Sequence, residues 1–301
     1  MSTAPNYLDA NTLDRVKRLD IRARLIVEGF IAGQHRSPYH GYAVEFATHR
    51  EYAPGDDLRH IDWKVWSRSD RLYIKQYEEE TNLSCTIALD ASRSMHYGGA
   101  WRKYDYAATA AASLAYLLQH QQDAVGLAIF NDRLLKNFPA SSHPNHFKQL
   151  LHELENTEPA AGTDAAAVFP ELARQIRQRG IIVLISDLFL PLNVLQDSLR
   201  QFRLRGNEVI VFQVMHQDEL TFPFRDDTLF RSLEDSAELL AEPSALRKTY
   251  LAAVERFLGE VRQTCAAAGA DHVLMSTNQK LDAVLGGYLA FRRKVRRAVR
   301  R

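Results

Sequence analysis

The sequence has little cysteine, almost no net charge and no long apolar run. Its 301 residues include two cysteines, Cys85 and Cys265, which belong to no CxxC or Cys/His cluster. This argues against a disulfide framework and indicates reduced thiols in a reducing compartment. The longest charge-free apolar stretch, Tyr106 to Gln119, is shorter than the roughly 18 to 20 residues that a membrane span requires. The N-terminus lacks the apolar core of a secretory signal, so we expect a cytoplasmic protein with no transmembrane segment.

The near-zero net charge conceals a strong asymmetry. The formal charge is +1, but the last eleven residues, FRRKVRRAVRR, carry seven basic groups and no acid, so residues 1–290 carry 1 − 7 = −6. This tail, residues 291–301, could contact nucleic acid or an anionic membrane surface, or it could be the solvated basic end of a final helix, which the helix dipole favours.

Apolar runs of strand length alternate with helix-length segments from residue 83 onward. We expect helices near residues 103–119, 143–154, 165–178, 193–205, 244–268 and 279–294. The expected strands are Ser84–Asp90, Ala124–Phe130, Leu134–Phe138, Ile181–Asp187, Glu208–Val214 and Asp271–Ser276. Nearly continuous apolar strands separated by helices are typical of a doubly wound, mostly parallel α/β sheet that is buried on both faces. This α/β domain is expected to cover residues 83–290. Residues 1–82 are predicted to form a helical and irregular segment, with a helix around residues 11–30, that packs on the domain.

Oxygen side chains gather at the predicted ends of two strands. The first strand ends in the DxSxS pattern of Asp90, Ser92 and Ser94, and the fourth ends at Asp187. In the doubly wound order 3-2-1-4-5-6 these strands are neighbours, so both aspartates would face one crevice. Thr163 lies in a third loop, before a predicted helix. An all-oxygen group with two carboxylates and no His or Cys favours Mg²⁺ or Mn²⁺ over Zn²⁺.

The five residues Asp90, Ser92, Ser94, Thr163 and Asp187 resemble the metal-ion-dependent adhesion site of von Willebrand factor type A domains. A second signature, EF(x)3RxYxPGDDxRxIDW, resembles the bacterial domain-of-unknown-function 58 family. In this sequence it comprises Glu45, Phe46, Arg50, Tyr52, Pro54, Gly55, Asp56, Asp57, Arg59, Ile61, Asp62 and Trp63. The resemblance implies a von Willebrand factor type A-like fold and a MoxR-type AAA+ ATPase as partner.

Each motif also has an ordinary structural interpretation. Ser and Asp are common in helix N-caps and strand-end turns, so DxSxS alone is weak evidence for a metal site. The acids of the PGDD segment alternate with Arg50, Arg59, Arg68 and Arg71, which indicates internal ion pairs in an irregular segment. His96 follows Ser94 closely, but no GxSxG elbow, P-loop or GxGxxG pattern is present.

The expected function is therefore non-enzymatic. Asp90, Ser92 and Ser94 would ligate Mg²⁺ or Mn²⁺ directly, and Thr163 and Asp187 directly or through water. The ion would capture an Asp or Glu of a partner protein, and the resemblance implies a role beside a MoxR-type ATPase in the assembly or remodelling of other proteins. The alternative is a metal-dependent phosphoesterase that uses the same carboxylates.

Overall fold

The computed structural model describes residues 18–35, 49–51, 73–75, 83–99, 101–160, 162–176, 179–226, 228–231, 238–282 and 284–286. The chain divides into two compact units, one formed by residues 1–32 and 83–301 and the other by residues 33–82. In the smaller unit, β1 (His49–Glu51) pairs antiparallel with β2 (Tyr73–Lys75). Residues 52–72, with most of the PGDD signature and Arg59, Arg68 and Arg71, lie outside the described residues, as does the tail, residues 291–301.

The larger unit is built on one six-stranded sheet with helices on both faces. Its elements are α2 (Leu19–His35, continuing past residue 32), β3 (Ser84–Asp90), the 3-10 helix η2 (Arg93–His96), α4 (Lys103–His120), β4 (Ala124–Phe130), β5 (Leu134–Ser141), α5 (Pro144–Asn156), α6 (Ala165–Gln175), β6 (Ile181–Ser186), α7 (Leu192–Leu204), β7 (Glu208–Met215), α8 (Gln217–Thr221), β8 (Thr228–Arg231), β9 (Glu238–Ala241), α9 (Pro243–Ala267) and β10 (Asp271–Ser276).

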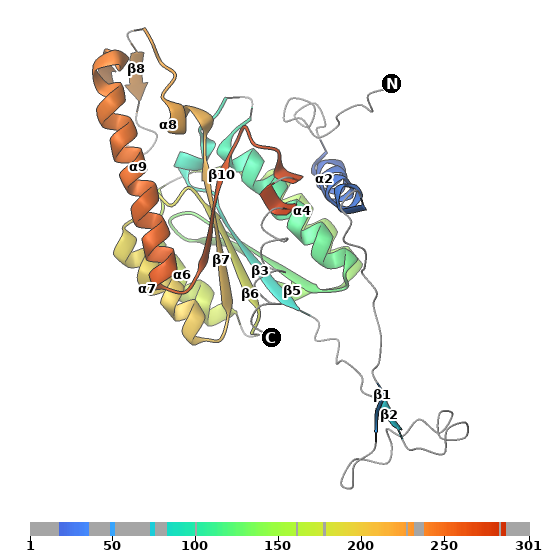
Figure 1. Cartoon of the computed structure of the whole chain (residues 1–301). Coiled ribbons are helices and arrows are strands. Elements are labelled where there is room, and N and C mark those ends of the chain that lie inside the picture. Colours follow the sequence, from blue (N-terminus) through green and yellow to red (C-terminus); the bar gives the residue numbers. More distant parts are fainter. Residues whose placement is uncertain are drawn as a thin grey trace, which may run out of the picture. The chain divides into compact units, whose positions relative to one another are not determined.

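The strand order is β10-β7-β6-β3-β4-β5 (Figure 1). Five strands run parallel, and β5 joins the edge antiparallel to β4. Numbered by the six predicted strands, this is the order 3-2-1-4-5-6. The predicted fold class, a doubly wound and mostly parallel α/β sheet, is confirmed, and the first and fourth strands are neighbours.

The central strands are buried on both faces. Successive side chains point to opposite sides of the sheet, and helices cover both sides. In β3, Ile87 and Leu89 belong to the apolar cluster that includes residues of α2, α4 and α5. Ala88, between them, belongs to the cluster that includes residues of α6, α7 and α9. Figure 1 shows α4 on one side of the sheet and α6, α7 and α9 on the other.

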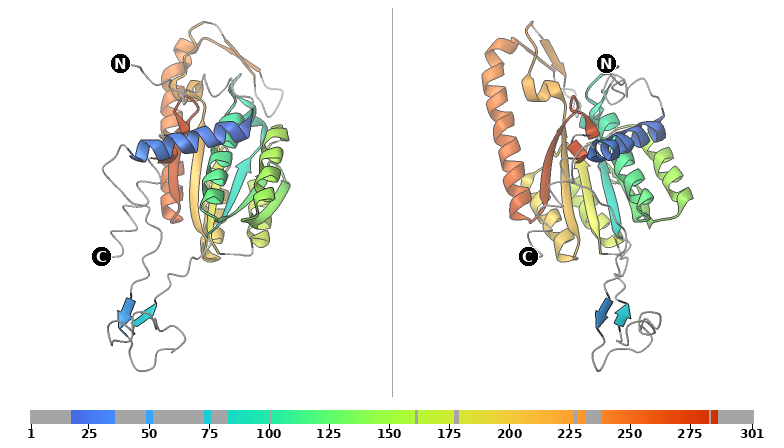
Figure 2. Two further views of the ribbon diagram at one scale, coloured as in Figure 1. Left: turned by 90° about the vertical axis from the view of Figure 1, so that its right-hand side faces the viewer. Right: turned by 45° about the vertical axis from the view of Figure 1, so that its right-hand side comes forward.

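Helix α2 packs on the α4 side of the sheet. Leu19, Ala23 and Ile26 are almost fully buried in the cluster that contains α4 and α5. The backbone N–H of Leu19 donates a 2.9 Å hydrogen bond to Oε1 of Glu155 on α5. Figure 2 shows α2 lying across the direction of the strands. Of the helix predicted around residues 11–30, residues 11–17 lie outside the described part.

Several boundaries differ from the sequence-based expectation for local reasons. β5 continues through Pro139 to Ser141, because an edge strand tolerates a proline that a central strand would not. The short helix α8 and the β8–β9 pair were not predicted, since four or five residues carry too little periodicity. The last predicted helix, residues 279–294, is described only as helical turns at residues 281–282 and 284–286.

Among the described residues, no helix combines the length and apolar character needed to cross a membrane.

Gly126 on β4 lies close to the backbone of β5, beside a register shift between Val125 and Leu127. A Cβ at this position would lie 2.7 Å from the backbone oxygen of Phe138. Gly126→Ala is therefore expected to lower the free energy of unfolding by about 1–3 kcal/mol, measured by urea denaturation. Gly259→Ala is the control, because a Cβ at this position meets nothing within 4 Å. The higher helix propensity of Ala should instead raise the free energy of unfolding by about 0.5–1 kcal/mol through α9. Equal shifts in the two variants would contradict this account of the β4–β5 contact.

Candidate functional site

The carboxyl ends of β3 and β6 lie side by side. Leu89 of β3 pairs with Ile185 of β6, so Asp90 ends one strand beside Ser186, and Asp187 follows directly. The Ser186 hydroxyl donates a 2.5 Å hydrogen bond to Oδ2 of Asp90. Both aspartates are only 1% exposed. The structure thus brings the two predicted carboxylates together in a buried region of the carboxyl edge, by which we mean the end of the sheet where the parallel strands finish.

The DxSxS segment forms a tight turn after β3. Oδ1 of Asp90 accepts a 2.8 Å hydrogen bond from the backbone N–H of Ser92. Ser92 precedes η2 in the N-cap position, yet its side chain makes no capping hydrogen bond. Its Oγ lies instead 3.0 Å from Oγ of Ser94, and both serines are buried. The contact of Asp90 is typical of an ordinary strand-end turn. The two hydroxyls are bonded to each other, and that of Ser92 does not cap η2.

The loop that carries Thr163 is attached to the same edge. The N–H of Ala160 donates to the carbonyl of Ala91 at 3.0 Å, and the N–H of Asp164 donates to the carbonyl of Asn131 at 3.3 Å. The Asn131 side chain donates in turn to the carbonyl of Ala160 at 2.9 Å. Thr163 lies between these anchors and is half-buried. The anchors hold its loop against the ends of β3 and β4, next to the DxSxS turn.

The carboxylate of Asp90 lacks sufficient compensation for its burial. Burial, with a contribution from the negative charge of Asp187, raises the pKa of Asp90 to about 6. Hydrogen bonds from Ser186 and Ser92 oppose this shift but do not cancel it. The ionised carboxylate is therefore destabilised in the folded protein, and a nearby cation would relieve that destabilisation.

A lysine that the sequence did not single out lies at this edge. The side chain of Lys103, the first residue of α4, is fully buried. Its Nζ donates to Oδ2 of Asp187 at 2.8 Å and to Oε1 of Glu219, on α8, at 2.7 Å. It also lies 4.8 Å from the ring centre of Phe189. Burial by itself lowers the pKa of Lys103, but the charges and hydrogen bonds of the two carboxylates outweigh it and raise the pKa above its ordinary value.

Comparison with known proteins decides the family. The model of the family described as "Protein of unknown function DUF58" matches residues 48–257. The chain belongs to the DUF58 family. This confirms the resemblance drawn from the signature segment, and the match spans all five predicted metal residues together with Lys103 and Glu219.

The sequence identity to individual proteins is low. The chain is 27% identical to "Uncharacterized protein Rv1480" of Mycobacterium tuberculosis (strain ATCC 25618 / H37Rv) over 285 residues, which is 93% of this chain and 89% of that protein. A crystal structure of conserved hypothetical protein BatB from Bacteroides thetaiotaomicron aligns with a TM-score of 0.48 and 16% identity, over 70% of this chain and 99% of that one. The SpRpn10 VWA domain aligns with a TM-score of 0.39 and 11% identity, over 67% of this chain and 93% of that one.

At the carboxyl ends of its strands the DUF58 chain has charged residues that its sequence motifs did not include. Asp187 was predicted as a metal residue, but its partners Lys103 and Glu219 were not. One signal was present in the sequence: Arg102 and Lys103 stand at the start of a predicted helix, where the helix dipole disfavours cations. Arg102 is explained by its ion pair with Asp105 at 2.9 Å. Lys103 required a partner that only the fold could supply.

The turn after β6 is strained and tightly held. Leu188 has a positive φ of 62°, which is unusual for a residue with a Cβ. Its N–H donates to the Ser186 hydroxyl at 2.9 Å, and the side chain of Gln213 on β7 donates to the carbonyl of Asp187 at 3.3 Å. Phe189 follows and is 43% exposed. Backbone strain beside two buried carboxylates is typical of functional sites.

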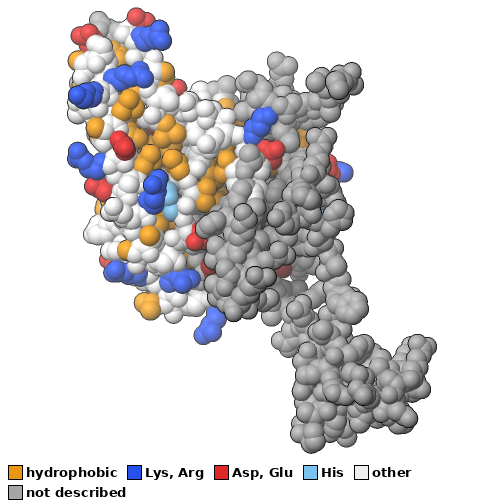
Figure 3. Space-filling view, in the orientation of Figure 1, with side chains coloured by type: hydrophobic (Ala, Val, Ile, Leu, Met, Phe, Trp, Pro, Cys, Tyr) orange, Lys and Arg blue, Asp and Glu red, His pale blue; other side chains and the backbone are white. Residues whose placement is uncertain are grey.

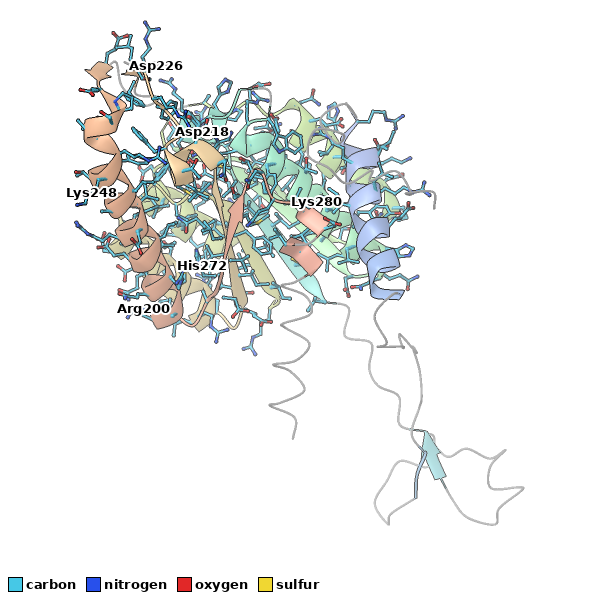
Figure 4. All side chains as sticks on the ribbon, turned by 45° about the horizontal axis from the view of Figure 1, so that its top comes forward. Arg200, Asp218, Asp226, Lys248, His272 and Lys280 are labelled. Carbon is cyan, nitrogen blue, oxygen red and sulfur yellow. The ribbon has the colours of Figure 1, made fainter. Side chains whose placement is uncertain are left out.

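The available ligands suit a hard divalent cation. Among the described residues, no group of three or more His, Cys, Asp or Glu side chains could hold a metal ion, so the candidate ligands are carboxylates with hydroxyls. Such ligands would suit Mg²⁺ or Mn²⁺ better than Zn²⁺. When Asp90, Asp187, Glu219 and Lys103 are all ionised, their net charge is 1 − 3 = −2. Figure 4 turns this edge toward the viewer and labels Asp218 on α8.

His96 does not form a catalytic pair with the serines in the described hydrogen bonds. Its side chain is exposed, and Nδ1 lies 3.4 Å from a guanidinium nitrogen of Arg102. The hydroxyls of Ser92 and Ser94 are instead hydrogen-bonded to each other. The geometry therefore gives no particular support to a serine nucleophile with His96 as its base.

Asp90→Asn tests the electrostatics of the edge. In EDTA at pH 7.5 the variant is expected to be about 1–3 kcal/mol more stable than the wild type, because it removes a poorly compensated buried charge. Since the pKa of Asp90 is raised to about 6, the folded protein binds this proton more tightly than the unfolded chain. Protonated Asp90 therefore favours the folded state at low pH, and this contribution to the free energy of unfolding is lost as pH rises from about 4 to about 6.

Urea denaturation across this pH range measures the effect. The wild-type curve should contain a decline that Asp90→Asn lacks. Asp197→Asn, an exposed position on α7, is the matched control and should follow the wild type. Parallel curves for wild type and Asp90→Asn would show that Asp90 is not destabilised by burial.

Proposed function

We propose that this DUF58 protein is a non-enzymatic interaction module in which a divalent ion, Mg²⁺ or Mn²⁺, captures an acidic side chain of a partner protein. The observation that carries the proposal is the convergence of Asp90, Ser92 and Ser94 at a buried strand end where negative charge is in excess. When bound, the ion would supply positive charge to this region and an electrophilic position for a partner carboxylate.

The residues would differ in how they contact the ion. Asp90, Ser92 and Ser94 would hold the ion directly, because they share one buried turn and no lysine is bonded to them in the part of the chain that the structure describes. Thr163 would contribute from its anchored loop. Asp187 already accepts a hydrogen bond from Lys103, which favours contact with the ion through water over direct ligation.

A MoxR-type AAA+ ATPase is the partner that we propose, with a role in the assembly or remodelling of other proteins. This part of the proposal is supported by the family to which the chain belongs. A cytoplasmic location is supported by Cys85 and Cys265, which are both free and buried. Acidic and basic side chains are interspersed on the described part of the face in Figure 3. Any contact with nucleic acid or an anionic membrane surface is proposed for the tail, residues 291–301, because its sequence carries seven basic groups and no acid.

Metal binding is expected to stabilise the folded protein. At a Mg²⁺ or Mn²⁺ concentration 100 times the dissociation constant, the free energy of unfolding should rise by about 2.7 kcal/mol, seen as a higher thermal midpoint. Ser94→Ala should lose most of this response. Ser198→Ala is the control, since the Ser198 hydroxyl bonds within α7 in the described contacts.

A protein that shows no response to either ion would contradict the metal site. Metal-dependent turnover of phosphomonoesters or phosphodiesters by the wild type, lost in Ser94→Ala, would instead favour the phosphoesterase alternative.

Binding to the ATPase is expected to require the ion. A purified MoxR-type ATPase from the same organism should bind the immobilised DUF58 protein in Mg²⁺ and lose at least tenfold in affinity in EDTA or with Ser94→Ala. The loss follows because the bridging charge between the two proteins is removed. Binding that is equally tight in EDTA would rule out a metal bridge while leaving the partnership intact.

A further inference from the structure

Lys103 occupies a position that opposes two ordinary preferences. It is a cation at a helix N-terminus, and it is fully buried although lysine is almost never buried unless it is paired. The contacts that make this possible are the bonds to Asp187 and Glu219 at 2.8 and 2.7 Å. A buried ion pair of this kind contributes little net stability compared with an apolar replacement, so its presence points to a role beyond folding.

Asp187 is engaged differently from the other predicted ligands. Its Oδ2 accepts from Lys103, and its Oδ1 accepts from the N–H of Phe189 at 3.3 Å. In contrast, the hydrogen bonds of Asp90, Ser92 and Ser94 come from neutral groups. Among the described contacts, Asp90 therefore has no cationic partner, whereas Asp187 already has an ammonium.

Glu219 connects this ammonium to α8. While Oε1 accepts from Lys103, Oε2 accepts a 2.7 Å hydrogen bond from the N–H of His216, where it completes the N-terminal cap of α8. The ring of Tyr97, which follows η2, lies 5.0 Å from the ring of His216. The start of α4, the end of β6 and the start of α8 are therefore joined through one charged nitrogen.

We propose that Lys103 is a tethered cation that occupies Asp187 and thereby sets how tightly the Asp90, Ser92 and Ser94 group holds a divalent ion. The inference rests on the proposed metal site and adds its regulation. The ammonium neutralises Asp187 when no ion is present, and it repels an ion that binds beside it. Removal of the ammonium leaves Asp187 free to attract or ligate the ion, so Lys103 weakens metal binding while it stabilises the metal-free edge.

Mn²⁺ titration of the full chain, followed by the electron paramagnetic resonance signal of free Mn²⁺, tests this directly. Lys103→Met, which keeps the length of the side chain but not its charge, is expected to lower the dissociation constant for Mn²⁺ at least tenfold. Lys103→Arg keeps the charge and should remain close to the wild type. A residue with a purely structural role would lower stability on replacement without tightening metal binding.

Two further variants separate the local effect from net charge. Lys136→Met removes a lysine that forms a half-exposed surface pair with Glu153 at 3.3 Å, and it should leave the affinity unchanged. The double variant Lys103→Met with Glu219→Gln removes one charge of each sign. It protects the fold from an excess of buried carboxylates, and it should still bind Mn²⁺ more tightly than the wild type because Asp187 is freed.

Each outcome decides the matter. Tighter binding in both Lys103→Met proteins, lost on adding Ser94→Ala, supports the inference. If the wild type binds Mn²⁺ and the folded Lys103→Met proteins bind it with unchanged or weaker affinity, the inference is overturned and the proposed function still stands. Binding only when Lys103 is replaced supports the inference but refutes a metal-loaded native protein. If no variant binds Mn²⁺, the proposed function and the inference both fail.

Discussion

The buried ammonium of Lys103, bonded to Asp187 and Glu219, is the interaction on which the carboxyl edge of the sheet depends. Three elements meet there, and each brings a charge that burial makes costly. Without the lysine, two largely buried carboxylates would have no cation among their described partners. With it, the negative charge of Asp90 remains uncompensated, and the raised pKa of that carboxyl is the physical sign of the deficit. The structure thus separates two carboxylates that are paired with an ammonium from one whose burial is offset only by neutral hydrogen-bond donors in the described contacts.

This separation arises from the topology of the sheet. In a doubly wound sheet the first and fourth strands are neighbours, so loops that are almost a hundred residues apart end at the same place. The strained turn at Leu188 and the anchored loop around Thr163 complete the arrangement. Polar groups that would be ordinary caps and turns in isolation become a cluster because parallel strands present all their carboxyl ends at one edge.

The sequence predicted the strands well where burial on both faces imposed a continuous apolar run. β3, β4 and β10 begin and end at the predicted residues. It predicted poorly where an element is too short to show periodicity, as in α8, whose five residues are held by a local cap between His216 and Glu219 and by the bond from Lys103 to Glu219. The DxSxS turn was recognisable because its three oxygen side chains lie within five consecutive residues. Lys103 was not, because its partners lie 84 and 116 residues away.

The sequence by itself determined the fold class, the family and the chemical character of the site, since these depend on periodicity, on signature residues and on the types of side chain at strand ends. Only the tertiary structure decided how the charges are paired. Electrostatic interactions depend on distances of a few ångströms between groups that the chain order separates widely. Whether Asp187 faces a metal ion or a lysine is therefore a property of the packed sheet edge and not of the DxSxS motif.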